Sequence, residues 1–70
     1  KDNDGWTVLM YAAVNGHLDV VKHLVEKLNE RNIEWWDVQN MNGETVFDIA
    51  KREDVKHILD KKMEEGKRQL

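Results

Sequence analysis

The sequence contains no cysteine, no proline and no serine. Without cysteine, neither a disulfide framework nor a thiolate zinc site can form, so the redox compartment cannot be read from this composition. Without serine or cysteine, a catalytic nucleophile is hard to find. No apolar run reaches the ~18 residues typical of a membrane-spanning helix, and none follows a basic start. We therefore expect neither a membrane span nor a secretory signal.

Charge is abundant and mixed in sign. The 70 residues include 11 Lys or Arg and 14 Asp or Glu, a formal net charge of −3. This composition is typical of a soluble surface and differs from the basic footprint of a nucleic-acid-binding protein. Residues 51–70 carry a mild excess of basic residues, but the signs alternate there. That alternation favours a solvated terminal helix over a site for an acidic partner.

Hydrophobic spacing predicts helices that pack in pairs. Residues 18–28 place apolar side chains at the i, i+3, i+4 and i+7 spacing of a one-sided helix. Residues 8–14 are nearly all apolar, which predicts a shorter helix packed on more than one side. Between them, Gly16 can adopt a positive φ at no steric cost, so the chain can reverse and lay the two helices antiparallel.

The same order recurs downstream. A short apolar segment at residues 46–50 precedes a second one-sided helix at residues 55–63, and a polar turn stands before each pair, at residues 2–7 and 40–45. The offset between the two units is 38 residues through the turns and falls to 34 through the second helices. The sequence therefore predicts an all-α fold with an internal repeat, in which the second unit has the shorter connection.

The residues of the two units resemble the ankyrin-repeat family. The shared pattern is a turn reading Asp/Asn-x-x-Gly-x-Thr, an apolar helix ending in alanine, a Gly-His pair, and then a Val-Val-x-x-Leu helix. The first unit carries it at Asp2, Gly5, Thr7, Leu9, Ala12, Ala13, Gly16, His17, Leu18, Val20, Val21, Leu24 and Val25. The second keeps Asn40, Gly43, Thr45, Phe47, Ala50, Val55, Ile58 and Leu59. It lacks the Gly-His pair, as a C-terminal capping repeat would.

The resemblance implies a single domain over residues 1–70, an ankyrin-like stack of two antiparallel helix pairs joined by a hairpin-like loop. We expect three segments: repeat one at residues 2–39, repeat two at 40–65 and a tail at 66–70. The first unit exceeds the family's usual length of about 33 residues. We interpret the excess as an extra turn of the outer helix through Glu30, followed by a loop that holds Trp35 and Trp36. One of these indoles is expected to cover the core and the other to stay partly wet.

Other polar and aromatic residues have structural interpretations. Thr7 and Thr45 are expected to cap helix starts. The imidazole of His17 is expected to bridge backbone groups of adjoining loops rather than to bind a metal, because no two histidines have the i, i+4 spacing of a helical zinc site. Tyr11 is expected in the core, provided that its hydroxyl reaches a partner.

The resemblance implies a non-catalytic scaffold that binds a protein partner through turn tips and the first helix of each repeat. The expected contact residues are Asn3, Asp4, Trp6, Val14, Asn15, Gln39, Met41, Asn42, Glu44, Arg52 and Glu53. Trp6 offers a large apolar area and one N–H donor, the profile of a binding anchor, but packing on an absent upstream unit explains it equally well. No cofactor, metal, nucleic acid or membrane is expected, and the family favours an intracellular over a secreted location.

Two repeats are fewer than the three or so that such stacks ordinarily need. The alternative to a binding scaffold is therefore a structural or self-associating fragment. In that interpretation the chain comes from a truncated or engineered repeat array, and its exposed N-terminal flank mediates oligomerisation.

Overall fold

The computed structural model describes residues 4–69. In that range the helices are α1 (Val8–Val14), α2 (Leu18–Glu30), the short 3-10 helix η1 (Trp35–Asp37), α3 (Val46–Ile49) and α4 (Glu53–Gln69). No strand occurs among these described residues, so the predicted all-α class is confirmed.

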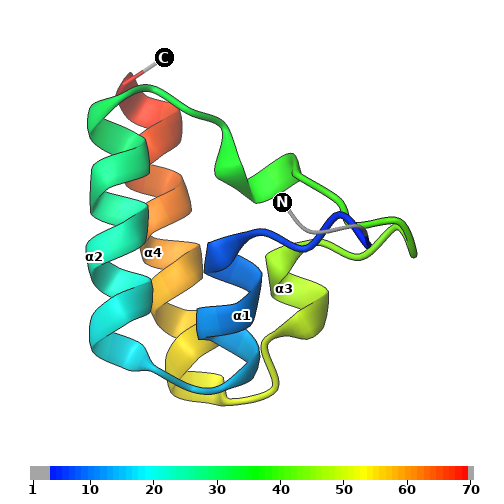
Figure 1. Ribbon diagram of the computed structural model, residues 1–70. Coiled ribbons are helices and arrows are strands. Elements are labelled where there is room, and N and C mark those ends of the chain that lie inside the picture. The colour runs from blue at the N-terminus through cyan, green and yellow to red at the C-terminus, as the bar shows by residue number, and fades with distance from the viewer. Residues whose placement is uncertain (1–3, 70) are drawn as a thin grey trace.

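The helices form an inner and an outer layer (Figure 1). The outer helices α2 and α4 lie side by side and run in the same direction, while α1 packs against both α2 and α3. The turns before α1 and α3 project together on the side of the molecule away from α2. This arrangement is the predicted stack of helix hairpins.

Local interactions explain where the first pair begins and reverses. The hydroxyl of Thr7 accepts a hydrogen bond from the backbone N–H of Met10 (3.2 Å), which caps α1 as expected. Gly16 has a φ of 69°, so the predicted reversal at this glycine is confirmed. In the turn, the backbone N–H of His17 donates to the carbonyl of Ala12 (3.1 Å). α2 then runs to Glu30, the end expected for the lengthened outer helix.

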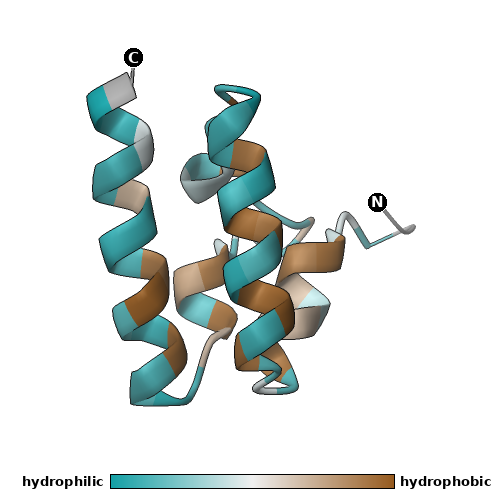
Figure 2. Cartoon of the chain, turned by 90° about the vertical axis from the view of Figure 1, so that its left-hand side faces the viewer, coloured by the Kyte–Doolittle hydropathy of each residue, from teal (hydrophilic) through white to brown (hydrophobic). Residues whose placement is uncertain are grey.

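The core lies between the two layers. Its buried apolar residues are Leu9, Met10, Ala12, Ala13, Val21, Val25, Trp35, Trp36, Val46, Ile49, Ala50, Val55 and Leu59. Figure 2 shows apolar bands along α2 and near the start of α4, whereas the second half of α4 is mainly hydrophilic. Within residues 4–69, no helix is both long and apolar enough to cross a membrane.

A buried amide holds the second half of α4 against α2 and η1. The side chain of Asn29 donates from Nδ2 to the carbonyl of Lys62 (2.9 Å), and its Oδ1 accepts from Nε1 of Trp35 (2.8 Å). Gly66 allows this close approach, because a Cβ there would lie 2.5 Å from Oδ1 of Asn29 and 2.7 Å from Cζ3 of Trp36. α4 therefore continues through residues that we expected to form a tail.

The two adjacent indoles differ from expectation. Trp35 and Trp36 are both buried, at 3% and 6% exposure, so the prediction that one stays partly wet is wrong. The reason is that η1 replaces the extended loop assumed for this segment. Its turn lets both rings face the core, with ring centroids 5.5 Å apart in an edge-to-face arrangement.

Tyr11 and His17 also correct the sequence interpretation. Tyr11 is 47% exposed, because no described element covers the face of α1 that it shares with Val8 and Val14. Its ring lies 5.1 Å from that of Trp6. His17 is exposed and makes no side-chain capping bond to α2, so the expected imidazole bridge is not found among the described residues.

Candidate functional site

One buried side chain organises the turn between the two helix pairs. Oδ1 of Asn40 accepts hydrogen bonds from the backbone N–H groups of Asn42 (2.9 Å) and Glu44 (3.0 Å). Nδ2 of Asn40 donates to the Glu44 carboxylate (3.0 Å), and the backbone N–H of Asn40 donates to the carbonyl of Glu44 (3.0 Å). These bonds give the tip at Met41 and Asn42 a defined backbone.

The first turn lies directly against the second. The backbone N–H of Met41 donates to the carbonyl of Asp4 (2.8 Å). Gly5, with a φ of 78°, makes room for this contact, because a Cβ there would lie 3.2 Å from both the Cα of Asn40 and the backbone N of Met41. The two tips therefore form one continuous surface.

Six of the residues expected to contact a partner lie together on these tips, and we call them the turn-tip surface: Asp4, Trp6, Gln39, Met41, Asn42 and Glu44. Met41, at 77% exposure, is the most exposed large hydrophobic residue that the structure describes. Asp4, Gln39 and Asn42 are exposed, whereas Glu44 is half-buried. Asn3, which we also expected here, lies outside the described residues.

Trp6 is half-buried and packs against the core cluster. Its ring stands beside that of Tyr11 in the same repeat. Only part of the indole therefore faces outward. Trp6 packs within the fold and leaves only this outer part for contact with a partner.

The remaining four expected residues, Val14, Asn15, Arg52 and Glu53, lie at the other end of α1 and form a second, separate group. At 1.5 Å per residue, a helix of this length separates the two groups by about 10 Å. Arg52 donates from Nη2 and Nε to the carboxylate of Asp54 (2.8 and 3.2 Å). A Cβ on Gly16 would lie 2.8 Å from Cδ of Arg52. The Arg52 side chain therefore also covers the turn between α1 and α2.

An apolar groove of about 420 Å³, which sequence reasoning missed, lies between α1, α2 and the segment containing η1. Its lining residues are Thr7, Val8, Leu9, Met10, Leu24, Lys27, Leu28, Arg31, Ile33, Trp35, Val38 and Val46. Val8 and Ile33 are 68% and 41% exposed. The unusual length of the first unit could have indicated that its loop encloses a space.

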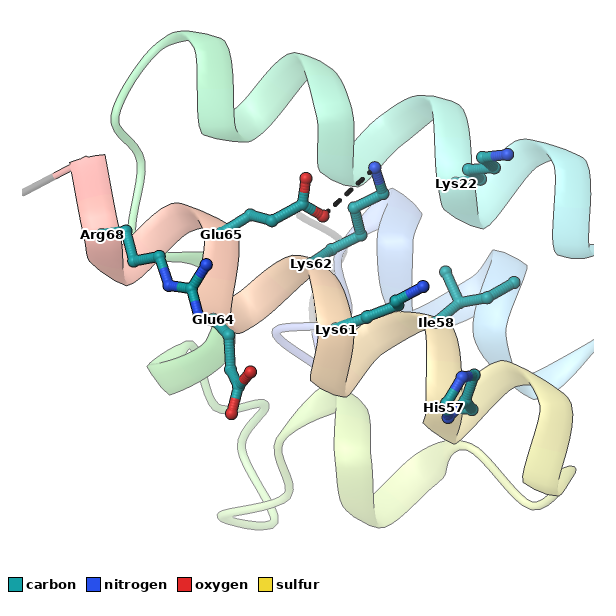
Figure 3. A pocket seen from close by; sticks show the side chains of 8 residues that line it. All are labelled: Lys22, His57, Ile58, Lys61, Lys62, Glu64, Glu65 and Arg68. Carbon is teal, nitrogen blue, oxygen red and sulfur yellow. Dashed lines mark ion pairs between the residues drawn. The ribbon is translucent and has the colours of Figure 1, made fainter.

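A polar groove of about 540 Å³ lies on the outer side of the molecule between α2 and α4 (Figure 3). The residues that line it are Lys22, His57, Ile58, Lys61, Lys62, Glu64, Glu65 and Arg68. Sequence reasoning missed this groove because Lys22 meets the other residues only when the outer helices pack. Across residues 4–69, no three His, Asp or Glu side chains gather in a way that could hold a metal ion.

Turns that stack on one another and helix hairpins that stack in two layers are the features of the predicted repeat. A family model described as ankyrin repeats (3 copies) matches residues 1–68. The chain belongs to the ankyrin-repeat family. Ankyrin repeats generally mediate protein–protein interactions, and a segment of them is typically non-catalytic. The family model has three copies, whereas the described part of this chain contains two helix pairs.

The ankyrin chain is also similar to proteins named NAD-capped RNA hydrolase NUDT12. It is 46% identical over 55 residues to those of Macaca fascicularis, Pongo abelii and Homo sapiens. The aligned segment covers 79% of this chain and 11% of each relative, so the chain spans about a tenth of the length of these relatives. No solved structure matches it significantly.

Proposed function

We propose that this ankyrin chain is a non-catalytic module that binds a protein partner through its turn-tip surface. The observation that carries the proposal is Met41, an apolar side chain 77% exposed on a turn held by Asn40 and by the bond to Asp4. Burying a side chain of this size is worth about 1.5–3 kcal/mol. Because the turn is already ordered, little additional entropy is lost on binding.

The polar neighbours of Met41 suit the rim of such an interface. Asp4 and Asn42 are exposed, and Gln39 donates from Nε2 to the carbonyl of Gly43 (3.2 Å) at the edge of the turn. In many interfaces an apolar centre is surrounded by polar side chains of this kind. The separate group at the end of α1, which includes Arg52 and Glu53, extends the contact for a partner that spans the length of that helix.

The test compares Met41→Ala with Val20→Ala, a matched change at an exposed apolar residue on the outer helix α2. A partner is first captured on the immobilised chain, purified, and titrated calorimetrically into each variant. Met41→Ala should weaken its binding about tenfold or more, while Val20→Ala should leave it unchanged. Equal losses in both variants, or no loss in Met41→Ala, would contradict the turn-tip surface as the interface.

We infer that, in a parent protein resembling NUDT12, this segment supplies partner binding and the hydrolysis of NAD-capped RNA resides elsewhere. The inference is supported by the match to a tenth of those relatives and by the typically non-catalytic character of ankyrin segments. The purified chain should therefore release no product from NAD-capped RNA. Turnover at a rate proportional to the concentration of the chain would contradict it.

A second candidate function, self-association through the N-terminal flank, is favoured by the apolar groove. Val8 and Ile33 line it at 68% and 41% exposure. Covering this surface with a second copy would remove it from water. Sedimentation over a range of concentrations should then show a dimer that dissociates on dilution and is lost in Val8→Glu. A monomer at every concentration would exclude this candidate.

A further inference from the structure

The polar groove between α2 and α4 concentrates positive charge on an acidic protein. Its lining residues include four Lys or Arg and two Glu, a formal net charge of +2. The whole chain carries −3, so the residues outside the groove carry −5. From the sequence alone, the alternating signs near the C-terminus indicate a solvated helix. The fold changes that interpretation, because it places Lys22 of α2 beside the basic residues of α4.

Most of these cations are not paired with a carboxylate in the described part of the chain. Among residues 4–69, Lys22, Lys61 and Arg68 have no carboxylate within ion-pair distance. Lys62 differs, since its Nζ lies 3.3 Å from the carboxylate of Glu65 and 3.8 Å from that of Glu26. The pair formed by Lys62 and Glu65 divides the groove, so that Lys22 and Lys61 lie in one half, away from Glu64 (Figure 3).

The half of the groove that holds Lys22 and Lys61 also has an apolar floor. Ile58 is half-buried between these two lysines, with His57 at the edge (Figure 3). The aliphatic stems of the lysines add further apolar surface beneath their charged ends. A ligand that matches this half carries carboxylates at its sides and an apolar group at its centre.

The lining residues favour a protein ligand over a nucleic acid. None of them is Trp, Tyr or Phe, and the imidazole of His57 lies at the edge, so the groove offers bases little surface on which to stack. Glu64 and Glu65 repel phosphates, which a nucleic acid carries at every nucleotide. A peptide tolerates these carboxylates better, because its backbone N–H groups can donate to them.

We propose that this groove is a second interaction site, which binds an acidic segment of a protein partner with an apolar side chain over Ile58. The site is separate from the turn-tip surface, since its residues come only from α2 and α4. Complementary charge increases the rate of association and selects among partners.

The experiment uses a short fluorescein-labelled peptide in which pairs of Glu alternate with pairs of Leu. The chain is titrated into this peptide, and binding is followed by fluorescence anisotropy. Saturable binding is expected, and Gln in place of every Glu should abolish it. The double variant Lys22→Glu/Lys61→Glu should weaken binding about tenfold or more. Lys51→Glu/Lys67→Glu makes the same change in net charge at exposed lysines outside the groove, and its effect should stay within about twofold.

Two controls show whether a loss of binding arises in the groove itself. Circular dichroism confirms that each variant folds, and Lys22→Gln/Lys61→Gln replaces the charge reversal if that variant does not. Met41→Ala should not change peptide binding, so failure of the turn-tip surface and failure of the groove can be distinguished. Three results would overturn the proposal: no saturable binding of the peptide, equal losses in both double variants, or tighter and groove-dependent binding of a single-stranded oligonucleotide of equal charge.

Discussion

The carbonyl oxygen of Asp4 accepts a hydrogen bond of 2.8 Å from the backbone N–H of Met41, and this bond joins the turns of the two helix pairs. It matters for function because it aligns the exposed side chains of both turns on one surface. A side chain on Gly5 would push the two turns apart by a few tenths of an ångström, since a Cβ there would lie 3.2 Å from the backbone of Asn40 and Met41.

Substitution of Gly5 tests this close approach. Gly5 and Gly43 have nearly equal positive φ angles, 78° and 76°, but a Cβ on Gly43 would meet no atom within 4 Å. Both alanine variants lose stability through backbone strain, and Gly5→Ala should lose about 1 kcal/mol more from the steric contact. Urea denaturation of the two variants measures the difference. Equal free energies of unfolding would show that the turns do not need this contact.

At Gly16 the positive φ, rather than steric crowding, should determine how much stability a substitution costs. A Cβ there would lie 2.8 Å from Cδ of Arg52, but that side chain is long, exposed and able to move. With φ at 69°, Gly16→Val should cost about 1–3 kcal/mol, whereas Gly16→Asn should cost less because asparagine tolerates this region. Thermal melts of both variants give the comparison. Similar losses of stability in Gly16→Val and Gly16→Asn would show that the positive φ is not what makes the substitution costly.

For Gly66 we expect the opposite of what helix propensity predicts. Alanine is favoured over glycine within a helix by about 0.8–1.0 kcal/mol. At this position, however, a Cβ would lie 2.5 Å from Oδ1 of Asn29 and 2.7 Å from Trp36, so Gly66→Ala should lower the free energy of unfolding. The loss should shrink when Asn29→Ala is added, which a double-mutant cycle measures. A stabilising Gly66→Ala would mean that α4 does not pack this closely.

Trp6 and Met41 should respond differently to alanine. Trp6 is half-buried against the core, so Trp6→Ala should lower the melting temperature as well as any partner affinity. Met41→Ala should change the free energy of unfolding by no more than about 0.5 kcal/mol, because its side chain is already in water. Differential scanning calorimetry of both variants checks this. A large stability loss for Met41→Ala would show that the side chain packs within the fold.

The helices of this chain could be predicted from sequence because their signals are local. The bounds of α1, the end of α2 at Glu30 and the positive φ of Gly16 follow from apolar spacing and from one glycine. Burial of both Trp35 and Trp36 could not be predicted in the same way. It depends on Asn29 and Gly66, which lie far apart in the sequence and meet only when α2 and α4 pack.

The candidate site could be predicted only in part, because the repeat pattern is local whereas the packing of distant segments is not. The repeat pattern places Asp4 and Met41 on turn tips, and the structure adds the hydrogen bond that aligns them. It also separates Arg52 from those tips, because this residue packs over Gly16 at the turn between α1 and α2. The groove that unites Lys22 with Lys61 depends on the packing of two helices and has no local signal.

Binding of a protein partner at the turn-tip surface can be located by a map of backbone amide chemical shifts, recorded as the purified partner is titrated into the isotope-labelled chain. The largest changes should fall at residues 39–44 and at Asp4 and Trp6, with smaller changes at the far end of α1. Changes confined to α2 and α4, with none in either turn, would contradict the turn-tip surface as the site of partner binding.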